Sequence, residues 1–373
     1  MIFIDWFLPG YKAGGPIRSC ANLIDHLKEE FEFSVVTRDT DYCETESYKN
    51  IKSDQWNLTP DGVRIYYFSS GNLNKKNIQD ILAKEEYDVV YLNGIFSPYF
   101  TLLPLYLLRG KNKSVVIAAR GMLAQSALAL KKTKKKLFLT LANTFGLFNG
   151  ALFQATKQEE IEDIKRVFGK NAEIKIAPNL PKKIKSNDLV ERKKEKGLVK
   201  LINVARIAPE KNLKYALEIL KSVKGSVEFD FYGPVYDETY WNECKEVIGT
   251  LPVNVKVNYK GSIESSKIES VLKENHFMFM PTKGENFGHI IIESLSAGCP
   301  VIISDQTVWR DLENKKAGWD LSLSDANSFV SIIEKAIEMS QEEYLATSGS
   351  AFSFAKGYIE NREMIKQNRE LFN

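Results

Sequence analysis

The sequence predicts an α/β protein built from two doubly wound, Rossmann-like domains that face each other across a cleft. Three observations lead to this prediction. Apolar, β-rich runs alternate with helical patterns, the alternation stops once at a charged segment and then restarts, and 373 residues suit two domains of ordinary size. Strands that alternate with helices form parallel sheets covered on both faces. Ligands of such sheets bind beyond the carboxyl ends of the strands, so we expect the site in the cleft.

The first half of the chain supplies six expected strands. Residues 1–4 are apolar and no basic segment precedes them, so we interpret them as a strand and not as a signal peptide. The other expected strands are 33–37, 64–68, 89–92, 115–119 and 151–155. Helical patterns lie between them, for example at 17–29, 123–141 and 158–168.

A charged segment without aromatic residues, 182–196, separates the two halves, and we expect a linker there. The strand pattern then restarts at 199–204, 227–232, 255–259, 277–280 and 300–304. Helices are expected at 213–223, 238–248, 267–274 and 287–297, and 341–371 reads as one long or broken helical stretch. The expected domains are therefore 1–181 and 182–355, followed by a final helix over 356–373.

The composition excludes several classes of protein. Hydrophobic residues make up 44% and charged residues 27%, which is typical of a folded globular chain. The four cysteines are scattered without a C-x-x-C pair, which argues against a zinc ribbon or a disulfide scaffold and favours a reducing compartment. With three histidines, a histidine-rich metal site is not expected.

The net charge of +3 hides an uneven distribution of charge. No Asp or Glu occurs from position 89 to 158. The ten basic residues of this stretch are Arg109, Lys111, Lys113, Arg120, Lys131, Lys132, Lys134, Lys135, Lys136 and Lys157. Such a patch favours a phosphate or an anionic membrane surface, although a solvated helix face is the alternative. Apolar runs at 95–103 and 137–139 are too short for the roughly 20 residues of a membrane span, so we expect at most a peripheral contact. Nucleic acid is not an expected partner, because no nucleic-acid-binding motif is present.

The segment 281–300 carries the strongest functional signal. An expected strand ends at Met280, a loop with Gly284 and Glu285 follows, and an apolar helix then begins near Gly288. Glycine lets a ligand approach the backbone, and the start of a helix favours an anion. Glu293 lies on the helix, which looks buried on nearly all sides. Because a buried carboxylate needs a partner, we interpret Glu285 and Glu293 as ligand contacts and not as a cap and a surface residue.

Two further loops carry candidate site residues, and each follows the first expected strand of one half of the chain. Arg206 and Lys211 lie five positions apart after the first strand of the second half, where they could neutralise a diphosphate; solvated loop charges are the alternative. Gly14 and Gly15 follow the first strand of the chain and precede Pro16, which suits a first helical turn. The complete G-x-G-x-x-G pattern is missing, which disfavours an NAD site.

These segments carry a resemblance to a known family. Gly284-Glu285-Asn286-Phe287-Gly288 with Glu293 resembles the E-x7-E motif of retaining glycosyltransferases of family 4. Arg206 with Lys211 is similar to the basic pair of that family, and Gly14-Gly15 to its amino-terminal glycine loop. The resemblance implies the GT-B fold, with an acceptor domain first, a nucleotide-sugar domain second and a final helix that crosses back.

The resemblance also implies roles for individual residues. Arg206 and Lys211 would hold the diphosphate of a UDP- or GDP-linked sugar, Glu285 would contact the sugar, and Glu293 would bind the ribose. The other implied donor contacts are Gly14, Gly15, Arg120, Gly233, Ser262, Ile263, Asn286, Phe287, Gly288 and His289. The catalytic set is then Glu285, Arg206 and Lys211, with no metal or other cofactor.

Two positions depart from the family pattern. Many relatives have a histidine near the end of the fourth strand, where this chain has Asn93, which we place on the acceptor side. An amide hydrogen-bonds a sugar but does not titrate. The usual glycine pair after 301–304 is replaced by Asp305-Gln306-Thr307.

The expected reaction moves a sugar to an acceptor hydroxyl with retained configuration, in surface-polysaccharide or lipid-linked glycan assembly. The expected location is the cytoplasm, including the inner face of the membrane. Three alternatives stay open: a nucleotide-sugar epimerase of the same architecture, a non-catalytic nucleotide-sugar-binding scaffold, and a metal site at Asp39-Thr40-Asp41, which spells D-x-D.

Overall fold

The structure, a computed structural model, describes residues 1–129, 132–184 and 189–373. The chain forms two compact units. Unit 1 contains Met1–Lys183 and Asn361–Asn373, and unit 2 contains Ile184–Glu360. The chain therefore leaves unit 1 once and returns to it for its last residues. The expected boundary at 355/356 lies inside helix α12 (Gln341–Ile359), whose start is fixed by a capping box between Ser340 and Glu343.

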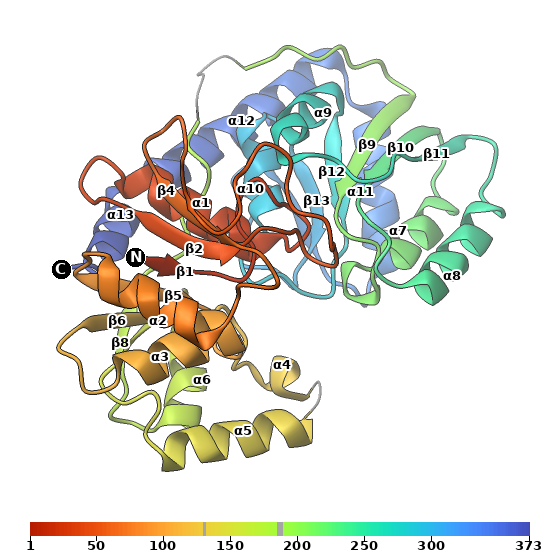
Figure 1. The fold of residues 1–373 in the computed structure, drawn as a ribbon. Helices are drawn as coiled ribbons and strands as arrows, with labels where there is room; N and C mark the ends of the chain where they lie inside the picture. Colours follow the sequence, from red (N-terminus) through yellow and green to blue (C-terminus); the bar gives the residue numbers. More distant parts are fainter. Residues whose placement is uncertain (130–131, 185–188) are drawn as a thin grey trace. The chain divides into compact units, whose positions relative to one another are not determined.

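Unit 1 contains an eight-stranded sheet among its described residues (Figure 1). Its strand order is β3-β4-β2-β1-β5-β6-β7-β8, and every neighbouring pair is parallel except β3 and β4. The strands are β1 (Ile2–Phe3), β2 (Ser34–Arg38), β3 (Trp56–Leu58), β4 (Arg64–Phe68), β5 (Val89–Asn93), β6 (Ser114–Ala118), β7 (Leu152–Ala155) and β8 (Glu173–Ile176). The helices are α1 (Gly15–Leu27), α2 (Lys75–Lys84), the short π-helix Pro98–Leu102, α3 (Leu103–Leu108), α4 (Gln125–Ala129), α5 (Lys132–Thr144), α6 (Gln158–Phe168) and α13 (Arg362–Arg369).

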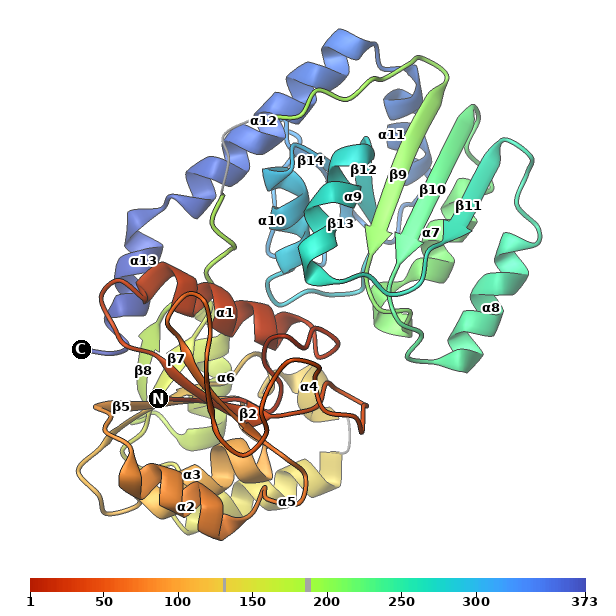
Figure 2. The same cartoon turned by 45° about the horizontal axis from the view of Figure 1, so that its top comes forward.

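The described part of unit 2 contains a six-stranded, wholly parallel sheet in the order β11-β10-β9-β12-β13-β14. The strands are β9 (Leu198–Val204), β10 (Ser226–Tyr232), β11 (Val255–Tyr259), β12 (Phe277–Met280), β13 (Val301–Ser304) and β14 (Gly318–Leu321). The helices are α7 (Leu213–Leu220), α8 (Glu238–Ile248), α9 (Ile268–Glu274), α10 (His289–Ser296), α11 (Ala326–Glu338) and α12, with short 3₁₀ turns at Pro209–Lys211 and Ser265–Lys267. Figure 2 shows the strands of this sheet between the two layers of helices.

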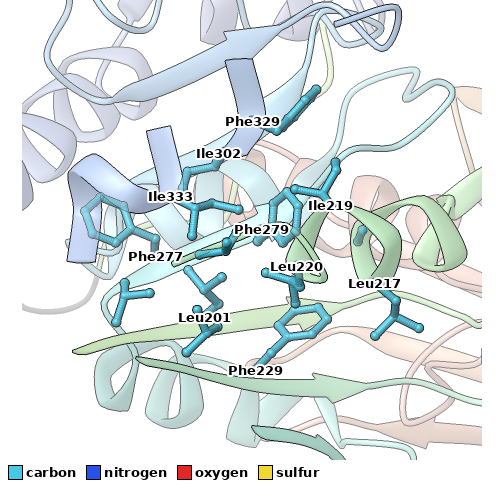
Figure 3. Packing of buried hydrophobic residues seen from close by; sticks show 14 of the residues in the cluster. Leu201, Leu217, Ile219, Leu220, Phe229, Phe277, Phe279, Ile302, Phe329 and Ile333 are labelled. Carbon is cyan, nitrogen blue, oxygen red and sulfur yellow. The ribbon is translucent and has the colours of Figure 1, made fainter. Parts of the chain in front are cut away.

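The two faces of the unit 2 sheet have separate cores because side chains alternate along each strand. Phe277 and Phe279 of β12 pack against α7 and α11, as Figure 3 shows with Phe329 and Ile333 of α11. Met278 and Met280 of the same strand point to the other face, where they join α9, α10 and α12. All four residues of β12 are fully buried, which is why its sequence is a continuous apolar run.

The end of the chain packs on unit 1. The amide of Asn368 in α13 donates to the carbonyl of Pro178 over 2.8 Å, and Arg369 forms an ion pair with Glu30. The ring of Phe372 lies 5.4 Å from that of Phe31 and 5.9 Å from that of Tyr91. These contacts explain why α13 belongs to unit 1 although the preceding helix belongs to unit 2.

The prediction of a linker over 182–196 is wrong for its second half. Arg192 and Lys194 are 6% and 3% exposed and lie inside unit 2. The Lys194 ammonium donates to the carbonyls of Ile337 and Met339, and burial lowers the pKa of this amine. A run of charged residues therefore does not indicate a solvated linker here, because these two side chains donate to buried acceptors and not to water.

Arg192 joins the carboxyl ends of two helices. Its guanidinium donates to the carbonyl of Lys273 in α9 over 2.7 Å and to that of Gly298, just after α10, over 2.8 Å. It also donates to Leu272, Ala297 and the hydroxyl of Ser348. The last carbonyls of a helix lack partners within the helix and carry negative partial charge, so a buried cation stabilises both ends.

Replacing Arg192 with methionine should destabilise unit 2 without changing its surface. The substitution keeps the apolar stem and removes the donor that serves the carbonyls of Lys273 and Ala297; each buried carbonyl left unsatisfied costs about 1–3 kcal/mol. We expect the free energy of unfolding in denaturant to fall by at least that amount. Lys193→Met is the matched control, since the Lys193 side chain is 85% exposed. Equal stability of the two variants would contradict this role.

Candidate functional site

The candidate site of unit 2 lies where strands β9, β10, β12 and β13 end. Because these strands are parallel, the loops that follow them meet at one edge of the sheet. The loop after β9 holds Arg206 and Lys211, and the loop after β12 holds Glu285. The topology thus places the two strongest sequence signals on neighbouring loops.

Backbone hydrogen bonds join these two loops. The amide of Lys283 donates to the carbonyl of Glu210 over 2.9 Å, and the hydroxyl of Thr282 donates to the same carbonyl over 3.1 Å. The side chain of Asn212, whose backbone is left-handed with φ 61°, donates to the carbonyl of Pro281 over 2.9 Å. The relative position of the loops is therefore fixed by polar contacts that do not involve the charged side chains.

Lys211 and Glu285 form the central ion pair of the site. The distance from Lys211 Nζ to Glu285 Oε1 is 2.5 Å, and the two side chains are only 17% and 15% exposed. Partial burial strengthens the attraction but adds a desolvation cost, so losing one partner is more harmful than losing both. A cation and a carboxylate are thereby held together at the edge where ligands of such sheets bind.

Arg206 is more exposed and has an acidic partner of its own. Its guanidinium contacts Glu210 Oε1 at 2.7 Å and lies 5.2 Å from the centre of the Tyr236 ring. Both side chains of this ion pair are more than 40% exposed, so its contribution to stability is small. An exposed pair of this kind can exchange Glu210 for a more highly charged anion at little cost.

Two glycines of the site are required by the fold itself. Gly233 has φ 150°, and a Cβ there would lie 1.9 Å from the carbonyl oxygen of Ala205. Gly288 caps α10 with φ 73°, and its Cβ would lie 2.8 Å from Ile291. By contrast, a Cβ on Gly284 would approach nothing nearer than 4.0 Å. The identities of Gly233 and Gly288 therefore follow from packing, whereas Gly284 is unconstrained by its surroundings.

The start of α10 is firmly held. The indole N–H of Trp309 donates to the carbonyl of Phe287 over 2.6 Å, and the rings of Phe287 and His289 lie 4.6 Å apart. Phe287 and His289 are buried, while Asn286 is exposed. Sequence analysis missed Trp309, which comes from a loop with no recognisable motif.

Glu293 lies one turn further along α10. The sequence led us to expect a helix buried on all sides, but Glu293 is partly exposed between buried neighbours. The expectation of a fully buried carboxylate is therefore wrong for Glu293. On the other side of the site, Ser262 is exposed and Ile263 partly buried, in the loop after β11. The amide of Gly233 donates to the carbonyl of Gly261, which ties this loop to the end of β10.

In unit 1 the glycine pair begins helix α1. Gly14 has φ 74°, a conformation that favours glycine, and Gly15 is the first helical residue. A Cβ on Gly15 would meet nothing within 4 Å. Packing within the chain therefore does not require glycine at position 15.

One aspartate of the D-x-D segment, Asp41, supports the loop that precedes this helix. Asp41 accepts hydrogen bonds from the backbone amides of Tyr11, at 2.9 Å, and Lys12, at 3.2 Å. Asp39 accepts one from the hydroxyl of Ser53 at 2.7 Å. Both carboxylates are at least 93% buried. Among the described residues, no group of three or more His, Cys, Asp or Glu side chains could hold a metal ion.

Asn93 and Arg120 lie together in a polar network. Arg120, with left-handed φ 54°, donates from Nε to Asn93 Oδ1 over 2.8 Å and from Nη2 to the hydroxyl of Tyr91 over 2.7 Å. Its Nη1 donates to Asn179 Oδ1. The thiol of Cys20 also faces this guanidinium, and burial raises the pKa of the thiol to about 11. All three nitrogens of Arg120 thus have acceptors within unit 1.

Only one of the three histidines lies in the candidate site of unit 2. His276 donates from Nε2 to the carbonyl of Lys193 and accepts from the amide of Lys200 at Nδ1, and burial lowers its pKa to about 4. The ring of His26 contacts the carbonyl of Pro181. His276 and His26 therefore support the fold, and His289 begins α10.

Comparison with known proteins identifies the enzyme class. Residues 185–350, most of unit 2, match the family model described as glycosyl transferases group 1. Sucrose-phosphate synthase from Thermosynechococcus elongatus superimposes with a TM-score of 0.69 and 15% identity, over 96% of this chain and 93% of that one. The chain is a glycosyltransferase with the GT-B fold. The predictions of fold class and enzyme class are confirmed.

Two other similarities extend the comparison. Anabaena HepE, in complex with UDP-glucose, has a TM-score of 0.70 and 15% identity, over 99% of this chain and 97% of that one. A Klebsiella pneumoniae protein, described as an uncharacterized 41.2 kDa protein in the cps region, is 22% identical over 68% of this chain and 70% of its own length. At such identities the structural likeness establishes the fold of the glycosyltransferase and not its substrates.

The buried contacts of Asp41 predict that this residue positions the glycine loop and does not bind metal. Asp41→Asn should keep the fold but lower catalytic efficiency about tenfold, or about 1.4 kcal/mol, because an amide group would face the N–H donors of Tyr11 and Lys12. Asp39→Asn, which leaves that loop untouched, is the control and should stay near wild type. Equal losses in both variants, or activity that EDTA removes and Mn²⁺ restores, would contradict this prediction.

The pairing of Lys211 with Glu285 makes a second prediction. Lys211→Met should lower the thermal melting temperature more than the double variant Lys211→Met/Glu285→Gln, because the single change leaves a partly buried carboxylate without its cation. Scanning calorimetry of the two variants and wild type measures this difference. A double variant that is less stable than the single one would refute the argument.

Proposed function

We propose that this glycosyltransferase moves a sugar from a UDP- or GDP-linked donor to an acceptor hydroxyl with retained configuration. The observation that carries the proposal is the ion pair of Lys211 with Glu285 at the carboxyl edge of the unit 2 sheet, beside Arg206. This edge offers two cations to a diphosphate and one carboxylate to a sugar. The UDP-glucose complex of HepE supports a nucleotide-sugar donor.

Each charged residue has a distinct part in the proposal. Arg206 exchanges Glu210 for the diphosphate, and its planar guanidinium gives bidentate contact, while Lys211 supplies a compact positive charge. Both stabilise the charge that develops on the leaving group. Glu285 orients the donor sugar through hydroxyl groups, and Glu293, partly exposed on α10, accepts hydrogen bonds from the ribose.

The backbone at the start of α10 completes the donor contacts. Phe287, Gly288 and His289 present amide groups at a helix start, which favours an anionic or electron-rich ligand. Ser262 and Ile263 contact the base. In unit 1, Gly15 leaves room for close approach of a ligand. Asn93 contributes on the acceptor side, and Arg120, which holds Asn93 by a hydrogen bond, contributes to donor binding.

The proposal also includes retention of the anomeric configuration and a reaction that needs no metal ion. The departing phosphate takes the proton of the acceptor hydroxyl on the same face of the sugar, so that no titrating residue is needed at Asn93. Cationic side chains replace the charge that a metal ion supplies in other transferases. The resemblance of Glu285 and Glu293 to the E-x7-E motif of family 4 supports this mechanism.

The acceptor is proposed to be a growing surface polysaccharide or a lipid-linked glycan. Two similar proteins support this class: the cps-region relative, and WaaG, a structural neighbour described as a glycosyltransferase involved in lipopolysaccharide biosynthesis. WaaG has a TM-score of 0.65 and 12% identity over 99% of this chain and 98% of that one. The proposed place of action is the cytoplasm, at the inner face of the membrane.

Calorimetry with UDP and GDP tests donor binding. One nucleotide should bind, and Lys211→Met should weaken it about tenfold to a hundredfold, since a hydrogen bond to a charged group contributes about 1.5–3 kcal/mol. Lys214→Met is the matched control, because Lys214 lies on α7 and pairs with Glu243 at the surface. Unchanged affinity in Lys211→Met, or binding of neither nucleotide, would refute the proposal.

Turnover separates transfer from the alternative activities. Glu285→Gln should reduce turnover by about 10² or more while nucleotide affinity changes little, if the carboxylate acts mainly on developing charge in the sugar. Mass spectrometry and NMR of the products identify the acceptor and the anomer. Conversion of the donor to an epimer without release of nucleotide would replace this proposal with an epimerase, and near-normal turnover would reject the role of Glu285.

A further inference from the structure

Helix α5 (Lys132–Thr144) of unit 1 has one face packed and one face exposed. Leu139 and Ala142 are 7% and 6% exposed and belong to the core of unit 1. Phe138 also packs there, with its ring 5.8 Å from that of Phe96. Figures 1 and 2 both show α5 at the periphery of unit 1.

The exposed face carries large apolar side chains. Leu137, Leu141 and Phe145 are 61%, 48% and 65% exposed. They lie four positions apart, so they form one stripe along the helix. Phe145 follows the last helical residue, but its amide donates to the carbonyl of Leu141 and continues the same turn. Three such side chains in a row are unusual for a surface that contacts only water.

The polar residues within the stripe satisfy their own hydrogen bonds. The hydroxyl of Thr140 donates to the carbonyl of Lys136, and that of Thr144 to the carbonyl of Thr140, each over 2.9 Å. These threonines lie between the apolar residues on the same face of the helix. Because their donors are already paired within the helix, this face can leave water at little cost.

The sequence segment that carries the stripe is strongly basic. Lys134 and Lys136 of α5 are exposed, and no Asp or Glu occurs between positions 89 and 158. Lys135 has another role, since its ammonium donates to the carbonyl of Ala127 and lies 5.4 Å from the Phe96 ring. Lys131, which belongs to the same basic run, lies outside the described residues. An apolar stripe with exposed lysines on its own helix, and no acidic residue in the same stretch of sequence, is complementary to an anionic lipid surface.

We propose that α5 lies in the plane of an anionic bilayer surface, with Leu137, Leu141 and Phe145 inserted among the acyl chains and Lys134 and Lys136 on the headgroups. The inference deepens the proposed function, since it rests on an acceptor that is carried by or assembled at a membrane. Among the described residues, no helix is long and apolar enough to cross a bilayer, so the contact is one of docking.

Vesicle flotation with the full chain tests the docking surface. Wild type should float with vesicles of phosphatidylcholine and phosphatidylglycerol, and at least tenfold less with phosphatidylcholine alone. Binding should also fall steeply at about 0.5 M salt, where the Debye length is only a few ångströms. Equal binding to both vesicles, or none to the anionic ones, would overturn the proposal.

Variants locate the surface. Leu137→Ser/Leu141→Ser/Phe145→Ser should reduce flotation at least tenfold, and Lys134→Gln/Lys136→Gln should reduce both affinity and its dependence on salt. Leu58→Ser/Val253→Ser removes two apolar side chains that are 73% and 106% exposed elsewhere and should bind as wild type does. Circular dichroism and melting temperature verify that each variant folds. Flotation that survives the triple change would overturn the assignment to α5.

The same variants keep this inference separate from the proposed function. Nucleotide affinity should be unchanged in the triple variant, because α5 carries none of the proposed donor contacts. If wild type binds nucleotide but does not float with anionic vesicles, the docking proposal alone is refuted. If it floats but binds no nucleotide, the donor proposal alone is refuted. If the triple change abolished self-association in sedimentation and left flotation intact, the stripe would be an interface between copies and the lipid proposal would fail.

Discussion

The contact between Lys211 and Glu285 depends on two loops that are 74 positions apart in sequence. Neither charge would hold its place without the parallel sheet, which brings the ends of β9 and β12 to one edge. Asn212, Thr282 and the amide of Lys283 then fix the loops to each other through carbonyl groups. The ion pair itself adds little to the fold, because its attraction is offset by desolvation. In the proposed function its value lies in a cation and a carboxylate that are positioned before the donor binds, which is the condition for electrostatic catalysis.

The sequence predicted the regular elements where periodicity was strong. Strands β4, β11 and β12 and helices α6 and α8 have the expected bounds, because long apolar or amphipathic patterns leave few choices of register. Strand β3 was missed, since a three-residue edge strand with partly exposed side chains carries almost no pattern. Strand β14 was missed as well: Gly318 and Asp320 interrupt its apolar character, and its register comes from pairing with β13.

Buried charged side chains were the feature that the sequence predicted least well. Arg192 and Lys194 stand in a run of charges that looks like a solvated linker, yet their acceptors lie about 80 to 150 positions away in α9, α10 and the end of α11. No local pattern can signal a partner at that distance. The aspartates of the D-x-D segment are similar, because their partners, Tyr11, Lys12 and Ser53, follow from the tertiary fold. A short acidic motif therefore has two physical meanings, and only the geometry of its neighbours separates them.

Arg120 shows how the same reasoning applies to an expected ligand contact. A guanidinium has five N–H donors, and in unit 1 its three nitrogens already reach Asn93, Asn179 and Tyr91. Tyr91 in turn donates to Gln154, so the network spans β5, the loop after β6, β7 and the segment that leaves unit 1. A ligand at Arg120 would have to share these donors or displace Asn179, whose segment continues into unit 2. The first role of Arg120 is therefore to fix Asn93, and the segment around Asn179 that leaves unit 1, relative to the sheet. A substrate that contacted Arg120 or Asn93 would meet side chains that this network already holds in position.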